Sequence, residues 1–424
     1  MKRRDFLKKT ALTLGAIAVG GKEVMAQDIH KEHKMRGMVH EPPAKDMKHE
    51  MKIHEPIGWA DPDIKLSSPP PLMGKQMGRV ITPNVLPLGY ERDGKIKVFT
   101  LIVQPVEYYM LDGEPPEDSL WDKVHKAKGL MAGMMLPKKV KAWGFNGSVP
   151  GPTIEAYEGD RVRIIVKNEL PEPTSIHWHG FEVPNDQDGS GGITQPPIQP
   201  GETFLYEFTL YQTGTLMYHA GFNEKKQVGM GLGGLFVIHP KKTKYKIAKD
   251  FAMLIQEWHI LPGNENPDVT STDPNWFTFN GKAAPSTEIL TVNEGDRVRV
   301  RFGNLSNQNA HPIHLHGYTW KVVGTEGGPI PESAQWPGNT VNVASGTVRD
   351  VEFIAWNPGL WAFHCHKLHH IVNAHADMPM GVMPMGGMTT ILNVIPKEGE
   401  FTFLGFPPIK KIKGWKHPGQ GGRR

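Results

Sequence analysis

The stretch that decides the fold reads EGDRVRI at Glu158–Ile164, and it returns almost unchanged as EGDRVRV at Glu294–Val300. Each copy is preceded by the tripeptide FNG, at Phe145–Gly147 and again at Phe279–Gly281. A repeat of this kind is the signature of one structural unit used twice. The sequence therefore predicts a duplicated architecture, and the remaining motifs can be compared between the two copies.

Two further pairs of blocks follow in the same order. HWHG at His177–Gly180 matches HLHG at His314–Gly317, and Gly214–His219 matches Gly359–His364. Three pairs in one order, at nearly constant separation, are not expected by chance. The duplication therefore extends over most of the chain, and histidines occupy corresponding places in both copies.

Short runs of alternating apolar and polar residues lie between the blocks, for example at Arg161–Val166 and Thr203–Leu210, and Gly, Pro and Asn bound them. Alternation with a period of two is typical of half-buried strands. We expect an all-β protein with one sandwich over about 75–240 and a second over about 245–398. The basic, Gly- and Pro-rich residues 399–424 are expected to form a C-terminal tail.

The composition excludes several classes of protein. The 424 residues carry a net charge of only +4, too little for the basic stripe of a nucleic-acid-binding surface. No segment beyond the N-terminus approaches 18 uninterrupted apolar residues, so no membrane span is expected. Cys365 is the single cysteine, which excludes an intrachain disulfide, and its metal or redox role has to be weighed against simple burial; the twenty methionines and twenty histidines are unusually many.

The N-terminus has the pattern of an export signal. Lys2–Lys9 reads KRRDFLKK, an apolar run follows at Ala11–Gly20, and small residues precede a cleavage point after Ala26. This pattern predicts a twin-arginine signal over 1–26 and a periplasmic location. Residues 27–74 lack either period and are expected to be disordered; their interleaved His and Met could capture copper or simply form a solvated tail.

The tripeptide His364–Cys365–His366 ends a strand-like run. Side chains in a strand alternate between faces, so the two histidines point one way and the thiol the other. Cys365 with His370 and His311 supplies the two-histidine, one-cysteine set of a blue-copper electron-transfer site. The flanking histidines then face a second centre, so this short stretch is expected to contact two metal sites.

The stretches Thr174–Gly180, His311–Gly317 and Phe363–His370 resemble the copper-binding motifs of multicopper oxidases. The two-domain count and the Met-rich flanks look closest to the bacterial copper oxidases linked to copper resistance. The resemblance implies two cupredoxin-like Greek-key sandwiches, with a type 1 copper that accepts electrons from a substrate. It also implies a trinuclear type 2/type 3 cluster that reduces dioxygen to water, about four coppers per chain, and a homotrimer that forms the cluster between subunits.

The resemblance also implies a role for each ligand in this chain. The matching positions are His311, Cys365 and His370 for type 1, His177 and His314 for type 2, and His179, His219, His316, His364 and His366 for type 3. Electrons would pass from the Cys365 sulfur through its neighbouring histidines. The first domain is expected to lack a type 1 copper, because Ala220 stands in place of the cysteine and Thr174 in place of a histidine.

Two positions depart from the family pattern. Gly221 stands where a further type 3 histidine is expected, so the cluster has seven of eight histidines. Water, Asn223 or Glu224 could complete it, with Glu224 the better side chain, or the site could stay incomplete.

The axial type 1 ligand is the second departure. Strict spacing places it at His375, but Met388 directly precedes the last strand-like run, so we favour Met388, with Met378 and Met380 as alternatives. The segment 378–388 holds five methionines and is interpreted as a loop that offers thioethers to Cu(I). Asp188 resembles the acidic residue that assists protons near type 2 copper, although an aspartate before glycine is also a common turn residue.

The sequence therefore predicts an exported copper oxidase that couples substrate oxidation to the reduction of dioxygen, with Cys365 and Asp188 as catalytic residues. Cu(I) is the favoured substrate, and phenols or other metal ions are the alternatives. A periplasmic copper-binding or electron-transfer protein with an incomplete cluster is a second hypothesis, supported by Gly221. A copper nitrite reductase is a third; its type 1 cysteine normally lies in the first domain, and it lacks the two histidines that flank Cys365 here.

Overall fold

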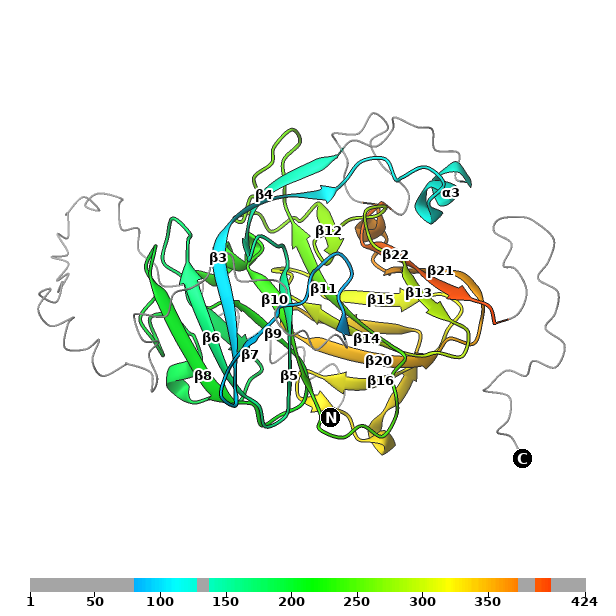
Figure 1. The fold of residues 1–424 in the computed structure, drawn as a ribbon. Helices are drawn as coiled ribbons and strands as arrows, with labels where there is room; N and C mark the ends of the chain where they lie inside the picture. Colours follow the sequence, from blue (N-terminus) through cyan, green and yellow to red (C-terminus); the bar gives the residue numbers. More distant parts are fainter. Residues whose placement is uncertain (1–79, 128–136, 373–385, 398–424) are drawn as a thin grey trace, which may run out of the picture. The chain divides into compact units, whose positions relative to one another are not determined.

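The computed structural model describes residues 80–127, 137–372 and 386–397, and all of them belong to one unit of the chain. The predicted signal 1–26, the segment 27–74 and the tail 399–424 lie outside these residues, as do His375, Met378 and Met380. The expected all-β fold is confirmed, because the described strands form four sheets that pack as two sandwiches (Figure 1).

The first sandwich packs a sheet of order β2-β3-β6-β8, with β4 beside β3, against a sheet of order β5-β10-β9-β7. Its strands are β2 (Glu91–Asp93), β3 (Ile96–Leu111), β4 (Lys138–Phe145), β5 (Gly151–Tyr157), β6 (Arg161–Asn168), β7 (Ile176–His179), β8 (Thr203–Thr209), β9 (Gly214–Ala220) and β10 (Gly233–His239). Phe99 and Ile164 from one sheet meet Trp178 and Phe236 from the other in a shared buried core. The repeated strand β6 thus lies in the middle of its sheet.

The second sandwich packs a sheet of order β1-β11-β14-β20-β16-β17 against one of order β13-β22-β21-β15-β19. In the first of these sheets, β12 also pairs with β11 and β18 with β16. Its strands are β1 (Val80–Ile81), β11 (Lys249–Trp258), β12 (Trp276–Phe279), β13 (Leu290–Asn293), β14 (Arg297–Asn304), β15 (His311–Leu315), β16 (Trp320–Thr325), β17 (Gly328–Pro329), β18 (Trp336–Gly338), β19 (Thr340–Val343), β20 (Val348–Ile354), β21 (Gly359–Cys365) and β22 (Thr389–Ile395). The strand β14, which repeats β6, again lies inside a sheet.

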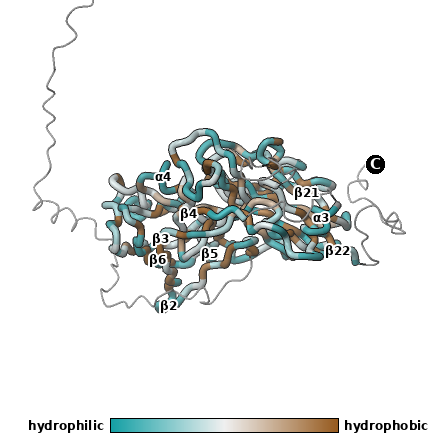
Figure 2. Tube along the Cα trace, turned by 90° about the horizontal axis from the view of Figure 1, so that it is seen from above, coloured by the Kyte–Doolittle hydropathy of each residue, from teal (hydrophilic) through white to brown (hydrophobic). Residues whose placement is uncertain are grey.

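Alternation along the strands explains why these segments pair as they do. In β3 the side chains of Phe99, Leu101 and Val103 are fully buried, while the residues between them are partly exposed. Such a pattern buries one face of the sheet and leaves the other to solvent or to a second layer. Figure 2 shows apolar stretches running through the interior and hydrophilic stretches at the margins, including the region of α4 (Glu224–Gly229).

The two sandwiches share a buried contact. Met217 and Leu235 of the first sandwich pack with Ala252 and Leu254 of the second. Beside this contact, the guanidinium of Arg301 donates to Asp250 over 2.7 and 2.9 Å and to the hydroxyl of Thr215 over 2.7 Å. A buried charge of this kind is stabilising only while its partners remain in place.

The helical elements are short. They comprise α3 (Leu120–Ala127), α4 and the 3-10 turns η1 (Asn185–Gln187), η2 (Glu332–Ala334) and η3 (Leu368–Ile371). The strand patterns did not predict α3, which packs on the second sandwich and donates the indole N–H of Trp121 to the carbonyl of Thr287 over 2.8 Å. Within the described ranges, no helix has the length and apolar character needed to cross a bilayer.

Candidate metal centre

Cys365 lies at the end of β21, beside the start of β15, where Ile313 pairs with Cys365. His311 begins β15, and His370 belongs to η3, a few residues after the cysteine. The Cys365 Sγ atom lies 3.7 Å from His311 Nδ1 and 3.5 Å from His370 Nδ1, and the two ring nitrogens are 3.1 Å apart. All three side chains are fully buried. One thiol and two ring nitrogens therefore converge on a single point.

Met388 lies in the same buried cluster as Cys365, immediately before β22. Its carbonyl accepts the Cys365 N–H over 3.1 Å, and its own N–H donates to the carbonyl of His370 over 2.9 Å. Met388 is therefore tied through its backbone to two of the three converging residues. Of the predicted axial ligands, only Met388 lies within the described residues.

Burial controls the protonation of this site. Burial raises the pKa of the Cys365 thiol to about 11 and lowers the pKa of His370 to about 2, with His311 adding to the second effect. The pKa of His311 is also lowered by burial. Without a metal the thiol keeps its proton and the imidazoles are neutral at pH 7. A soft cation that displaces the thiol proton would then meet one thiolate and two neutral imidazoles, the donor set that copper prefers.

Four histidines gather on the other side of the same strands. His364 and His366 flank Cys365, and their rings contact His314 at centroid distances of 5.8 and 5.5 Å. The His316 Nε2 atom lies 3.0 Å from His364 Nε2. The alternation expected for the tripeptide is thus present in the structure: the thiol faces His311 and His370, whereas its two neighbours face this second group.

Backbone carbonyls determine which ring nitrogen each histidine can offer. The Nδ1 of His364 is 2.8 Å from the carbonyl of Cys365, and the Nδ1 of His314 is 2.8 Å from the carbonyl of Asn339. A carbonyl can only accept, so the Nδ1 atoms of His314 and His364 carry the proton and their Nε2 atoms keep the lone pair that a metal needs. The Nε2 atom of His364 accepts from His316 Nε2.

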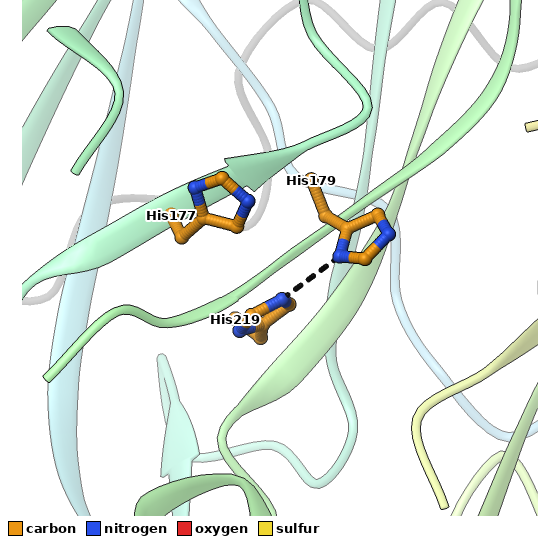
Figure 3. A group of neighbouring side chains, drawn as sticks. All are labelled: His177, His179 and His219. Carbon is orange, nitrogen blue, oxygen red and sulfur yellow. Dashed lines mark hydrogen bonds between the residues drawn. The ribbon is translucent and has the colours of Figure 1, made fainter. Parts of the chain in front are cut away.

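A third group belongs to the first sandwich (Figure 3). His177 and His179 of β7 lie beside His219 of β9, and the potential ligand atoms of the three side chains lie within 4.8 Å of one another. The carbonyl of Asp188 lies 2.9 Å from His177 Nδ1, so Nε2 is left for a metal. In contrast, His179 turns its Nδ1 towards His219 Nε2, at 3.1 Å, as the dashed line in Figure 3 shows.

Burial and the neighbouring histidines lower the pKa of two rings in this third group. Burial lowers the pKa of His219 to about 3, and His177 and His179 contribute to the shift. Burial likewise lowers the pKa of His179. Neutral rings are what a metal ligand requires. The carboxylate of Asp188 accepts from Ser190 Oγ over 2.5 Å and lies 3.5 Å from His177 Nδ1, on the side of the ring away from Nε2.

The structure explains why Gly221 carries no side chain. A Cβ atom at this position would lie 2.2 Å from the carbonyl oxygen of Gly189 and 3.0 Å from Ser175 Oγ. Three hydrogen bonds hold these segments together: Gly221 N–H to the Ser175 carbonyl, Gly191 N–H to the Gly221 carbonyl, and Ser175 Oγ to the Gly189 carbonyl. The loop 188–191 thus occupies the space where the eighth histidine would begin.

The two side chains considered as substitutes do not complete the group. Asn223 donates to Glu172 over 3.3 Å, away from the histidines. Glu224 is close enough to act on the pKa of His179, which it raises against the stronger effect of burial, but it is not among the ligand atoms within 4.8 Å of one another. Within the described residues this group therefore consists of three histidines.

The first sandwich also lacks a thiol site of its own. Ala220 is buried where the aligned strand carries Cys365, and the Thr174 hydroxyl donates to the buried Gln227 side chain over 2.7 Å. The amide of Gln227 donates in turn to Glu172 over 2.9 Å. Hydrogen-bonded polar side chains thus lie where soft metal ligands would be required.

The groups of the two sandwiches are separate within this chain. No hydrogen bond or ring contact joins the three histidines of the first sandwich to the four of the second among residues 80–127, 137–372 and 386–397. His316 and His366 are exposed, and His314 is partly exposed. The second group is therefore open to a ligand from another molecule, and His177 and His179 of the first group are partly exposed.

The environment of His311 was not predicted from the sequence. Glu257 lies with one carboxylate oxygen 3.6 Å from His311 Nε2, and its side chain is only 2% exposed. Burial acts to raise the pKa of Glu257, but interactions with His311 and Asn309 outweigh it and hold the pKa below its usual value. The only signal available was a glutamate in the otherwise uncharged run Phe251–Trp258.

Comparisons with known proteins point to one family. A family model for multicopper oxidases matches residues 131–243, and a second one matches residues 261–382. Laccase-19 of Oryza sativa subsp. japonica is 30% identical over 243 residues, which are 51% of this chain and 39% of that protein. The chain thus spans about two fifths of the length of the curated relatives it matches.

Solved structures show the same fold. The blue copper oxidase from Nitrosomonas europaea superposes with a TM-score of 0.57 at 27% identity, over 71% of this chain and 86% of that one. The copper nitrite reductase from the same organism gives a TM-score of 0.53 at 22% identity, over 70% and 94%, a likeness that concerns the fold alone. Both sandwiches are of the cupredoxin type. With family models matched over more than half of its length, the chain belongs to the multicopper oxidase family.

Proposed function

We propose that the protein is a copper oxidase that takes electrons one at a time at the Cys365 site and passes them to dioxygen. The observation that carries this proposal is the splitting of His364–Cys365–His366 between two groups of metal ligands. One strand end thereby joins an electron-accepting site to a histidine cluster. Copper bound at these sites would supply the one-electron redox chemistry, since a thiolate with two imidazoles suits both of its oxidation states.

The chain's own residues supply the metal ligands and transfer the protons. Reduction of dioxygen to two waters consumes four electrons and four protons. The Asp188 carbonyl keeps His177 turned with Nε2 outward, and the Asp188 carboxylate, bonded to Ser190, is placed to pass a proton towards this group. Cys365 and its two neighbours provide the covalent route along which electrons leave the thiol site. Met388 is the proposed axial ligand.

Cu(I) is the proposed substrate. The chain carries methionines throughout the segment 378–388 and interleaved Met and His in 27–74, and thioethers are ligands for Cu(I). Four Cu(I) ions would be oxidised for each dioxygen reduced to water. Phenols and other metal ions are the alternative substrates that an assay has to compare.

The complete oxygen site is proposed to form between subunits of a homotrimer. The first sandwich contributes His177, His179 and His219, and the second sandwich of a neighbouring subunit contributes its four histidines. This assembly is supported by the separation of the two groups within one chain and by the exposure of His316 and His366. Seven histidines would then hold three coppers, and Cys365 would hold the fourth.

Two further aspects belong to the same proposal. Residues 1–26 are proposed to act as a twin-arginine signal that leads to the periplasm, on the pattern of the sequence alone. The domains are proposed to extend over 75–240 and 245–398, with β1 at the start of the first range pairing with β11 of the second sandwich. That division is supported by two main hydrophobic clusters, one formed by residues between 88 and 238 and the other by residues between 251 and 394.

Metal analysis with optical spectroscopy and oxygen consumption tests the proposal. Copper-loaded protein should contain about four coppers per chain, show an intense visible band, and consume oxygen with Cu(I). The variant Cys365→Ser should lose the band and the turnover together. One copper per chain without oxygen uptake would instead support a binding or electron-transfer protein, the hypothesis that Gly221 favours. Turnover of nitrite without oxygen would support the nitrite reductase.

A further inference from the structure

His311 has a second polar side that the thiol site does not use. Its Nδ1 faces Cys365 and His370, whereas its Nε2 lies 2.9 Å from Ser306 Oγ and 3.6 Å from a carboxylate oxygen of Glu257. With Nδ1 turned to the metal, Nε2 must carry the ring proton, so it donates to the serine hydroxyl and faces the carboxylate. A carboxylate behind a histidine ligand fixes the orientation and tautomer of the ring.

Glu257 is held in this place by several donors. One carboxylate oxygen accepts the backbone N–H groups of Gln308 and Asn309 over 2.6 and 3.1 Å. The other accepts the side-chain amide of Asn309 over 2.8 Å. The oxygen of the same amide accepts from Lys367 Nζ over 2.7 Å. The network thus connects the end of β11 with the loop before His311 and with the segment that follows Cys365.

The carboxylate has no direct cationic partner in the part of the chain that the structure describes, where its one contact of this type is His311. Its charge lies close to the metal site, because one carboxylate oxygen is 3.6 Å from Nε2 of the ligand His311. A buried charge is weakly screened, so its effect on a nearby ion is larger than that of a surface charge. Copper loses one positive charge on reduction, and an adjacent anion opposes that loss.

We propose that Glu257 is a positioning residue of the Cys365 site, which orients His311 and lowers the reduction potential of the copper bound there. The inference rests on the proposed function, since it requires copper at the thiol. It assigns the buried carboxylate an electrostatic role that a neutral side chain of the same shape would not fulfil. Ser306 contributes the hydrogen bond to His311, and Glu257 contributes the charge.

The test is a redox titration of the visible band in copper-loaded wild type, Glu257→Gln, Glu257→Asp and Ser306→Ala. Glu257→Gln should keep the band and raise the potential, with the equilibrium constant for reduction increased at least about tenfold, or ~59 mV for one electron. Glu257→Asp keeps the charge and should stay close to wild type. Ser306→Ala should shift the potential less than Glu257→Gln. Glu352→Gln is the matched control and should have no effect, because Glu352 is a largely buried carboxylate of the same sheet that pairs with Arg299.

An unchanged potential in Glu257→Gln with the full visible band would overturn the role of Glu257. If Glu257→Gln does not hold copper, Glu257→Asp decides: a wild-type potential supports the role of the charge, and a raised potential refutes it. Failure of the proposed function looks different: wild-type protein loaded with copper would show no visible band, or would keep the band without consuming oxygen. Electron paramagnetic resonance of the oxidised variants provides a readout that is independent of turnover, since reorientation of His311 would change the copper hyperfine splitting.

Discussion

Replacing Gly221 by alanine tests whether the loop 188–191 occupies the place of the missing ligand. The added Cβ atom would lie 2.2 Å from the carbonyl oxygen of Gly189, whereas ordinary contacts begin near 3.4 Å. The two backbone segments would have to separate by about 1 Å. Ser175 contributes two of the three hydrogen bonds that join them. Because the close contact is with a backbone carbonyl, no flexible side chain can relieve it.

The magnitude follows from these hydrogen bonds. Each contributes roughly 0.5–1.5 kcal/mol, so weakening all three should lower the free energy of unfolding of Gly221→Ala by about 2–4 kcal/mol. Urea unfolding of the copper-free protein measures the change. Gly327→Ala is the matched control, because Gly327 is exposed and the nearest atom to a Cβ there, Thr325 Oγ1, lies 3.6 Å away. The control should remain within about 0.5 kcal/mol of wild type.

Two results would refute this reasoning. One is a Gly221→Ala variant as stable as Gly327→Ala, which would show that the loop yields without cost. The other is a Gly221→His variant that folds with wild-type stability and strengthens the near-ultraviolet band of a coupled copper pair. That outcome would mean that an eighth imidazole fits, and that the space is open rather than filled.

Three further results are expected. Arg301→Met should lower the free energy of unfolding by about 3–5 kcal/mol, because Asp250 and Asp350 would be left as buried charges. Urea unfolding tests this, and a loss under about 1 kcal/mol would contradict it. The pKa of His219 is about 3 in the folded protein, below the value near 6.5 in the unfolded chain, so copper-free protein should lose stability as the pH falls from 6.5 towards 3. The loss should reach up to about 1.4 kcal/mol per pH unit. Unfolding measured at several pH values should show a smaller slope for His219→Gln. Asp188→Asn should reduce oxygen consumption about 10²-fold, because the carboxylate that passes protons is lost. The copper content and the visible band should not change, since the backbone carbonyl that orients His177 is retained. Unchanged turnover would show that Asp188 is not part of the proton route.

Some features of the candidate site were predictable because they depend on local chain geometry. Alternation along a strand separates Cys365 from His364 and His366 in any sheet that contains this segment. The i, i+2 spacing of His177 and His179 likewise places both rings on one face of β7. These relations involve neighbours in the sequence, so they hold whatever the rest of the chain does.

Other features could not be predicted because they involve partners far apart in the chain. The helix α3 follows the strand β3, and its position depends on the contact between Trp121 and Thr287. The short β1 joins the sheet of the second sandwich, by pairing with β11, although it precedes the first sandwich in the sequence. No local pattern indicates such pairings.

The sequence by itself determined the duplicated all-β architecture, the sets of histidines and the opposite facing of Cys365 and its neighbours, because strand periodicity and repeat spacing are properties of short segments. Only the tertiary structure decided that the Gly189 carbonyl fills the space beside Gly221 and that Glu257 stands behind His311. Both contacts join separate loops and strands, and packing of the whole sandwich sets their distances.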